Sequence, residues 1–543
     1  MKIDHLYEAA RTSRRRHRLH GTTLAIAAAL TVAASAPAQA QVARIETVVV
    51  DCARRLGPAD QVRDFLAAGG GLEAVAGDAD HPLVQAWRDL GMRRITYEKI
   101  HIETPEEIPF LTVTRSPAGD IDIDFSAWDE HLRNAVENLG STPFLHLGAI
   151  PQALSSHPEA DNYWAYQPQS LDEWQSFVAR IVEHTVNVLG LVGLSYGVNG
   201  EPDHPDTWKG SGSGDPNQTL REHIELYAAT YRGVKSADPA AQVGGPATMS
   251  WQASRYTTDP PFVLADWIRA LAQYNQEQTS DPAVTLDFVA WQDYSWVSDQ
   301  ISDGADAVSG FLEENGFDPA TPKMIGDSGW GSWSSDYFDG TLEPHQRASH
   351  LLHNVIREFR DPRARKFLAG ILYYCFFFRE DWVTPGFEAE METLRRVALV
   401  ICRLDGGYDR TPIYAGFEMV AAMTRGDIVQ TIAPAALAAM ATRDDLADSV
   451  AATVNNHHAE TFQTELVLRN LPRTDGLVYV RLQRIDSAHS VAGQGLEAPS
   501  SEALRVSDGM LRLPLTLEAY GSVQVSVRPI RIFAQDFTPD LLP

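Results

Sequence analysis

Hydrophobic positions along the chain follow two different periods, one after the other. Up to about residue 424, short apolar runs rich in β-branched residues alternate with longer stretches of helical period. After Thr424 the period becomes two, and in "VYVRLQRI" the apolar Val478 and Val480 alternate with polar side chains such as Arg481. The change of period predicts two domains, which we place at residues 41–424 and 425–543.

Eight runs in the first region have the length and composition of β-strands. They are "RIETVVVD", "MRRITYE", "TPFLHLG", "LVGLSYGVNGEP", "AQVGGPA", "LDFVAWQDY", "KMIGDSG" and "GILYYCFFF". Helical patterns lie between them. In residues 171–189, for example, Trp174, Phe177 and Ile181 share one face, and Ser170 precedes the helix as its N-cap. Eight strands that alternate with helices predict an α/β fold, a (β/α)8 TIM barrel.

The second region reads as strands with one buried face. In "LRLPLTLEAY", Leu511, Leu513 and Leu515 alternate with polar or small residues, and "SVQVSVRP" repeats the pattern. Such strands pack their apolar faces against each other in pairs of sheets. Residues 425–543 are therefore predicted to form a C-terminal β-sandwich domain.

The first 40 residues have the pattern of an export signal. Basic residues, including the pair Arg14 and Arg15, precede the apolar run "LAIAAALTVAASA", and Ala38 and Ala40 form a small-x-small cleavage site. We therefore expect a signal peptide over residues 1–40, read by the Sec or the twin-arginine route. The mature chain would begin near Gln41, without a membrane span, in the periplasm or outside the cell.

The charge balance restricts the possible partners. The chain has a net charge of −27, and removing residues 1–40, with six basic and two acidic residues, leaves −31. This excess disfavours nucleic acids and anionic membranes. The three cysteines, Cys52, Cys375 and Cys402, are too few and too scattered for a disulfide scaffold or a zinc site. We predict neither a metal nor a cofactor.

Two carboxylates follow predicted barrel strands. Glu201 ends the fourth predicted strand and Asp327 ends the seventh. Barrel enzymes carry their catalytic residues at these carboxyl ends, and two carboxylates across a cleft are what glycoside hydrolysis requires. Each residue also has a structural interpretation, because Glu-Pro is common in solvated turns and Asp before small residues caps helices.

The order of the motifs resembles a known enzyme family. "LGMRRITY", "VGGPA", "LDFVAWQDY" and "RTPIYAGFEMVAAM" follow one another as in the glycoside hydrolases of clan A, and most closely as in family 39, which contains β-xylosidases and α-L-iduronidases. The resemblance covers nearly all of the mature chain. It implies that Glu201 is the acid/base and that Asp327 is the nucleophile or base.

The chain departs from the family pattern near both carboxylates. Gly200 stands where the family has an Asn that binds the sugar, and Asn199 can replace it only if the backbone shifts. Gln292 stands where the family usually has His, and Asp327 where it has Glu. The shorter Asp327 side chain withdraws its carboxylate by about 1.5 Å. Retaining enzymes need about 5–5.5 Å between the carboxyls and inverting enzymes about 6.5–9.5 Å. Retention, inversion and loss of hydrolysis therefore all remain open.

Several side chains near the strand ends are expected to bind sugar. Indole rings stack on the apolar faces of sugars, and Arg379 is suited to a uronic acid carboxylate. Structural ion pairs are the alternative role for the charged residues. The predicted substrate-binding set is Asn199, Glu98, His146, Gln292, Tyr294, Trp330, Trp333, Arg379 and Trp382.

We therefore hypothesise an exported glycoside hydrolase that acts on a β-linked or uronic-acid-containing oligosaccharide or polysaccharide. Two alternatives remain open. One is a catalytically silent barrel that binds glycans. The other is a carbohydrate lyase, in which one base abstracts a proton beside a uronate and the second carboxylate is not needed.

Overall fold

A computed structural model describes most of the chain between residues 46 and 530. The described residues are 46–60, 62, 66–69, 77–97, 111–198, 200–205, 207–249, 251, 262–278, 282–292, 300–325, 343–360, 368–373, 377–380, 395, 398–489 and 500–530. The predicted signal peptide, residues 1–40, lies outside them.

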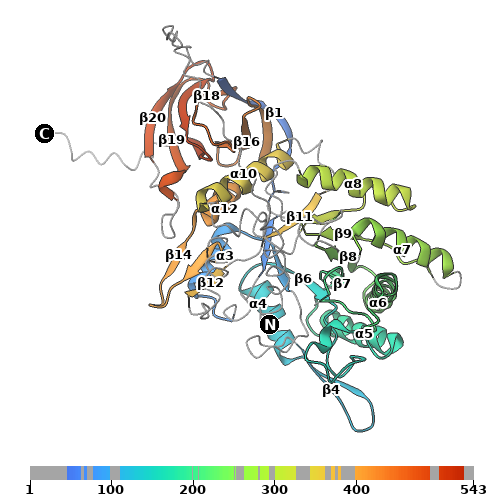
Figure 1. The fold of residues 1–543 in the computed structure, drawn as a ribbon. Coiled ribbons are helices and arrows are strands. Elements are labelled where there is room, and N and C mark those ends of the chain that lie inside the picture. Colours follow the sequence, from blue (N-terminus) through green and yellow to red (C-terminus); the bar gives the residue numbers. More distant parts are fainter. Residues whose placement is uncertain are drawn as a thin grey trace, which may run out of the picture.

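Eight strands, each parallel to its neighbours, close into a barrel (Figure 1). In ring order they are β2 (Leu66–Gly69), β3 (Arg94–Tyr97), β6 (Thr142–Leu147), β7 (Ser195–Val198), β8 (Gln242–Thr248), β9 (Phe288–Trp291), β10 (Lys323–Ile325) and β11 (Leu368–Tyr373). All except β2 fall in runs that the sequence predicts as strands. The fourth and seventh strands of the barrel are accordingly β7 and β10.

Side chains alternate between the inside and the outside of the barrel. Phe144, Phe288 and Met324 form a small apolar cluster with Ala247 and Ala290. The intervening residues of the strands, such as Tyr196, Val289 and Trp291, instead belong to the large core that the strands share with the helices. The barrel interior is therefore filled by side chains, and a substrate site has to lie at an end of the strands.

Amphipathic helices pack around the barrel. They are α3 (Pro82–Leu90), α4 (Ser126–Glu137), α5 (Leu171–Asn187), α6 (Pro216–Ala237), α7 (Leu264–Glu277), α8 (Gln300–Glu314), α10 (Pro344–Phe359) and α12 (Pro412–Ala422). The predicted N-cap of α5 is confirmed, because Ser170 Oγ accepts a hydrogen bond from Glu173 N at 3.3 Å. Within the described part of the chain, none of the helices is long and apolar enough to cross a membrane.

Two small sheets extend the barrel. The hairpin of β4 (Thr112–Arg115) and β5 (Ile121–Asp124) lies between β3 and α4. A three-stranded sheet of β12 (Phe377–Arg379), β13 (Val400–Cys402) and β14 (Tyr408–Arg410) follows β11. Single 3-10 turns occur at Tyr163–Ala165 and Ser487–His489.

The C-terminal region contributes eight of the nine strands of a separate sheet. These strands are β15 (Asp427–Ile432), β16 (Leu437–Asp444), β17 (Ser449–Asn456), β18 (Phe462–Arg469), β19 (Gly476–Ile485), β20 (Ser500–Val506), β21 (Leu511–Leu517) and β22 (Ser522–Pro529). The predicted period of two is confirmed in β21, where every second residue is buried. The nine strands are hydrogen-bonded in one continuous order around a single apolar cluster, and not as two separate sheets.

The ninth strand, β1 (Glu46–Pro58), corrects one prediction. The run "RIETVVVD" was expected to begin the barrel, but β1 pairs with β15 and β18 of the C-terminal sheet. Its buried residues alternate with more exposed ones, and Val48, Val50 and Cys52 enter the core of that sheet. Such alternation is typical of a strand with one buried face, whereas parallel barrel strands are buried on both faces. The barrel begins instead with β2.

Helices α10 and α12 join the barrel to the nine-stranded sheet (Figure 1). Ser349 Oγ on α10 donates to the carbonyl of Asn456 at 3.0 Å and accepts from Asn455 Nδ2 at 2.7 Å. Gln524 Nε2 donates to the carbonyl of Met419 on α12 at 2.6 Å. The three side chains and two carbonyl groups belong to buried residues, so the hydrogen bonds replace contacts with water that the interface excludes.

Three partly or fully buried histidines lie at the same interface, and we call them the interface histidines. His350 and His353 lie one turn apart on α10, and His457 follows β17. His350 Nδ1 is 3.5 Å from His457 Nε2, and the ring centroids of His353 and His457 are 4.9 Å apart. Asn354 Nδ2 lies 3.2 Å from His350 Nε2, which continues the polar chain into the helix.

Candidate functional site

Glu201 lies just beyond the carboxyl end of β7, in a backbone conformation that residues other than glycine rarely adopt. Its φ is +55°, in the left-handed region. Its N–H donates to the carbonyl of Ala247 at 3.0 Å, and its carbonyl accepts from His204 N at 2.9 Å and from the Thr207 hydroxyl. A strained residue persists only where its surroundings fix it. Here one hydrogen bond holds the backbone of Glu201 against the end of β8, and two more hold it within its own loop.

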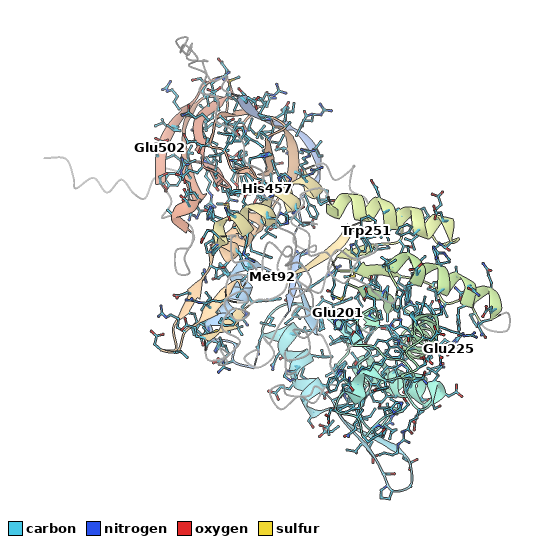
Figure 2. All side chains as sticks on the ribbon, in the orientation of Figure 1. Met92, Glu201, Glu225, Trp251, His457 and Glu502 are labelled. Carbon is cyan, nitrogen blue, oxygen red and sulfur yellow. The ribbon has the colours of Figure 1, made fainter. Side chains whose placement is uncertain are left out.

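Gln292 holds the Glu201 side chain. It follows β9 directly, its side chain is 1% exposed, and its backbone N–H donates to Thr248 O at 2.7 Å. Its Nε2 donates to Glu201 Oε1 at 2.9 Å. The ends of three consecutive barrel strands, β7, β8 and β9, are thereby connected around one carboxyl group. Figure 2 labels Glu201 within the barrel and Glu225 on the outer helix α6.

His146 occupies the neighbouring position on β6. It lies on the same face of the strand as Phe144, with ring centroids 4.9 Å apart, and its side chain is buried. Its register partner on β7 is Gly197. A Cβ at Gly197 would come within 2.9 Å of the His146 ring, closer than a carbon atom can approach. The glycine therefore makes the room that the imidazole occupies next to the strand carrying Glu201.

We expect Gly197→Ala to displace His146 and to lower kcat/KM by about tenfold, because small displacements of site residues are costly. The backbone of Gly197 tolerates alanine, so the effect should come from the contact with His146 and not from the strand. Gly310→Ala is the matched control, since that glycine lies in α8 with open space around its Cβ position. Steady-state kinetics of both variants test this prediction. Parent-like kinetics for Gly197→Ala would mean that the position of His146 is unimportant.

A second buried carboxyl lies next to Glu201. Asp203 is 2% exposed, and its Oδ1 and Oδ2 accept from Met249 N at 2.9 and 3.1 Å. Burial raises the pKa of Asp203 to about 7; the hydrogen bond from Met249 N opposes the rise, and the charge of Glu201 adds to it. The sequence prediction missed Asp203. The available signal was a second acid two residues after Glu201 in "GEPDHPD".

The site residues lie above the apolar filling of the barrel. His146 follows Phe144 on β6, and Gln292 follows Phe288 and Ala290 on β9, each at alternate positions that face the same side. The polar groups near Glu201 therefore stand at the carboxyl end of the strands, on an apolar floor. Of the predicted set, the structure brings together Glu201, Gln292 and, on the adjacent strand, His146.

Arg379 follows the eighth barrel strand, as predicted, and lies in the three-stranded sheet. It ends β12, in register with Cys402, and is exposed. Its contact with a sugar carboxylate stays a prediction. Seven other predicted site residues lie outside the described part of the chain: Glu98, Asn199, Tyr294, Asp327, Trp330, Trp333 and Trp382.

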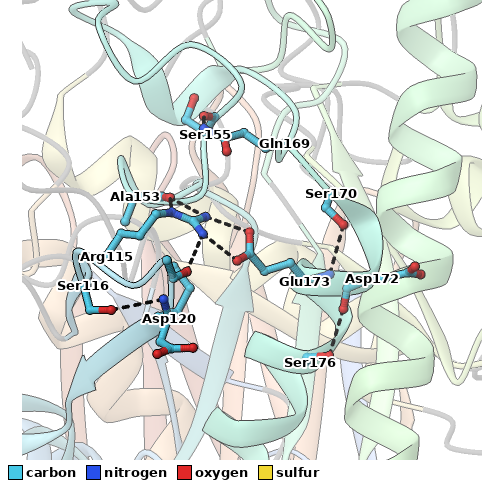
Figure 3. A network of polar contacts seen from close by, with 12 residues as sticks. Arg115, Ser116, Asp120, Ala153, Ser155, Gln169, Ser170, Asp172, Glu173 and Ser176 are labelled. Carbon is cyan, nitrogen blue, oxygen red and sulfur yellow. Dashed lines mark hydrogen bonds and ion pairs between the residues drawn. The ribbon is translucent and has the colours of Figure 1, made fainter.

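A polar network attaches the β4–β5 hairpin to α5 (Figure 3). Both terminal nitrogens of Arg115 donate to the Glu173 carboxylate, at 2.7 and 2.8 Å, and Arg115 also donates to the carbonyl of Ala153. A two-pronged Arg–carboxylate contact fixes orientation as well as distance. A cavity of about 310 Å³ lies beside this network, lined by residues of β4 and of the segment from Pro151 to Tyr163.

Metal ligation has no candidate in the part of the chain that the structure describes. No group of three or more His, Cys, Asp or Glu side chains there is arranged to hold a metal ion.

Part of the barrel matches a known protein family in sequence. The sequence pattern of "Glycosyl hydrolases family 39" matches residues 90–314, which include β3 to β9 and therefore Glu201 and Gln292. A β-xylosidase of Geobacillus stearothermophilus is 33% identical over 115 residues, 20% of this chain. The match spans only 21% of the length of that relative.

Solved structures resemble the chain over most of its length. A GH39 enzyme from Xanthomonas axonopodis pv. citri superimposes with a TM-score of 0.67 at 18% identity, over 91% of this chain and 100% of the other. A monomeric β-xylosidase from Caulobacter crescentus CB15 gives a TM-score of 0.64 at 18% identity, over 90% and 100%. At this identity the likeness concerns the fold. Together with the sequence match over residues 90–314, it confirms the predicted resemblance of the chain to glycosyl hydrolase family 39, in clan A.

Proposed function

We propose that the protein hydrolyses O-glycosidic bonds in an oligosaccharide or polysaccharide, with Glu201 as the general acid/base. The observation that carries the proposal is the Glu201 carboxyl, at the end of the fourth barrel strand, with one oxygen 2.9 Å from the Gln292 amide. A positioned carboxyl at this end of a barrel can protonate the oxygen of a leaving sugar. The sequence match to family 39 over residues 90–314 supports the same chemistry.

We infer that Asp327 supplies the second carboxylate. It comes two residues after β10, the seventh strand of the ring, although its own position is outside the described residues. In a retaining reaction it would attack the anomeric carbon, and in an inverting reaction it would take a proton from the attacking water. The aromatic residues Trp330 and Trp333 in the same segment are proposed to stack on the substrate.

We further propose a (β/α)8 barrel that carries the catalytic residues, with the nine-stranded sheet supplying none of them. Export of the chain through the signal pattern in residues 1–40 would bring the enzyme to the periplasm or the medium, where polysaccharide is encountered. The matched β-xylosidase makes β-linked xylosides the first substrates to examine. Uronic-acid-containing glycans are the second class.

The experiment is a panel of purified oligosaccharides, including xylosides and uronosides, incubated with residues 41–543 and followed by mass spectrometry. Hydrolysis adds one water to each cleaved bond and gives saturated sugars, which is the expected result. A lyase instead gives an unsaturated product that absorbs in the ultraviolet. A glycan-binding barrel gives binding without any product. Either of the last two outcomes would overturn the proposed hydrolysis.

Proton NMR of the first-formed product then assigns the stereochemistry. Retention of the anomeric configuration requires carboxyl groups about 5–5.5 Å apart, and inversion requires about 6.5–9.5 Å. Asp327→Asn should abolish turnover by either route, because an amide neither attacks the anomeric carbon as a carboxylate nor takes a proton from water. Undiminished turnover in this variant would remove Asp327 from the mechanism.

A further inference from the structure

Asp203 connects the two loops that hold Glu201. It lies in the loop after β7, and its carboxyl accepts from the N–H of Met249, the first residue after β8. In the opposite direction, the N–H of Glu201 donates to Ala247 O near the end of β8. Both hydrogen bonds join the loop after β7 to the end of β8. The residue between their ends on β8, Thr248, accepts the backbone N–H of Gln292.

The side chain of Asp203 is therefore well placed to act on the Glu201–Gln292 contact. Loss of the Met249 cross-link would free the end of β8, and with it the acceptors of the Glu201 and Gln292 backbone N–H groups. The backbone of Glu201 is also in the left-handed region, so it needs such support to persist. A buried carboxyl is costly unless it is hydrogen-bonded, and Met249 N supplies the hydrogen bond that Asp203 needs.

We propose that Asp203 is a positioning residue, which fixes the loop after β8 through Met249 N so that the Glu201 carboxyl stays within reach of Gln292 and of the glycosidic oxygen. The inference rests on the proposed role of Glu201 as the acid. It assigns to Asp203 no contact with the substrate.

Asp203→Ala removes the acceptor, and we expect kcat on natural glycans to fall by about 10- to 100-fold with KM changed by less than about threefold. The loss should be smaller on an aryl glycoside with an acidic phenol, because that leaving group needs little protonation. Asp203→Asn keeps an oxygen that accepts from Met249 N, so it should restore kcat to within about threefold of the parent. Equal losses on both substrates would show that Asp203 acts on general stability and not through Glu201.

Asp238→Ala is the matched control. Asp238 is also buried, and its carboxyl accepts from Gly193 N at 2.7 Å and Ala240 N at 3.0 Å, but it follows α6 at the opposite end of the barrel. We expect this variant to lower the melting temperature at least as much as Asp203→Ala while leaving kcat within about twofold of the parent. A loss of kcat as large as that of Asp203→Ala would overturn the positioning role.

Crystal structures of the variants separate this proposal from the proposed function. The distance from Gln292 Nε2 to Glu201 Oε1, 2.9 Å in the parent, should be kept in Asp203→Asn and lengthened beyond hydrogen-bonding range in Asp203→Ala. This readout needs no turnover. An unchanged distance in Asp203→Ala would refute the positioning role even if the parent is active. A lengthened distance in Asp203→Ala, found together with a parent that hydrolyses no glycan, would refute the hydrolase proposal alone.

The melting temperature of Asp203→Asn tests independently whether the Asp203 carboxyl is buried. The pKa of Asp203 is raised to about 7, chiefly by burial. A carboxyl with a raised pKa contributes stability that is present below its ordinary pKa near 4 and is lost as the pH rises through 7. We therefore expect the melting temperature of Asp203→Asn, relative to the parent, to increase between pH 4 and pH 8. Parallel melting curves over this range would mean that the carboxyl is exposed to water in solution.

Discussion

Glu201→Gln is expected to lower kcat on natural glycans by about 10²- to 10⁴-fold, the usual contribution of a positioned general acid. The amide can still accept the hydrogen bond from Gln292 but has no proton to give to the leaving oxygen. An aryl glycoside with an acidic phenol leaves without such help, so its cleavage should be largely spared. Kinetics of the variant on the two substrate types, measured side by side, test the role.

Glu225→Gln is the control for this substitution. Glu225 lies on the outer helix α6, where it pairs with Arg221 one turn away at 3.3 Å (Figure 2). Arg221 is exposed and Glu225 is partly exposed, and a pair so open to water contributes little to stability. The control should therefore behave as the parent on both substrates. Equal losses for Glu201→Gln on natural and aryl glycosides would argue that Glu201 is not the proton donor.

Acid is expected to weaken the contact between the barrel and the nine-stranded sheet through the interface histidines. Burial lowers the pKa of His457 to about 2 and that of His353 to about 4, and nearby positive or titrating groups, His350, His458 and Arg360, act in the same direction. Tyr520 also packs on the His457 ring. The two imidazoles are thus neutral in the folded protein, whereas the unfolded chain binds protons below about pH 6.5.

The sign of the effect follows from this difference. The contribution of the two histidines to stability is complete above pH 6.5 and is lost as the pH falls toward 4 and then 2. Allowing for their partial exposure, we expect them to lower the free energy of unfolding by about 2 kcal/mol between pH 7 and pH 5. His457→Gln should reduce that loss. Urea unfolding at the two pH values, followed by circular dichroism, measures it.

His157→Gln is the comparison variant, because His157 lies in the segment after β6 with 39% of its side chain exposed. The free energy of unfolding of this variant should change with pH in the same way as that of the parent. If His457→Gln lost as much stability on acidification as the parent does, the interface histidines would not be responsible for acid sensitivity. Carboxylates elsewhere in the protein would then account for the whole effect.

The sequence predicted the barrel well because most of its strands are short apolar runs between strongly amphipathic helices. Seven of the eight strands lie where expected, since a run such as "TPFLHLG" is apolar enough to be buried on both faces. The exception is β2. Its sequence "LAAG" is too short, and most of its side chains are too small, for the segment to be recognised as a strand. The run before it was assigned to the barrel because it is a good strand, and strand propensity does not say which sheet a strand will join.

Only those site residues that directly follow a recognisable strand could be predicted from the sequence. Glu201 and Gln292 follow recognisable strands, so their meeting at one end of the barrel was foreseeable from the topology. The role of Asp203 was not, because its partner Met249 is 46 residues away and becomes adjacent only when β7 and β8 pair. Arg379 shows the converse limit, because the predicted eighth strand runs on into β12, which pairs with β13 in another sheet.

The position of β1 makes the barrel an insertion within the nine-stranded sheet. β1 lies between β15 and β18, and its Arg55 pairs with Asp427, 372 residues later in the chain. The sheet cannot be completed until nearly all of the chain has been synthesised, which is a slow, non-local step in folding. A fragment that begins at residue 425 would lack this central strand and would expose two open strand edges, which invite association with other chains.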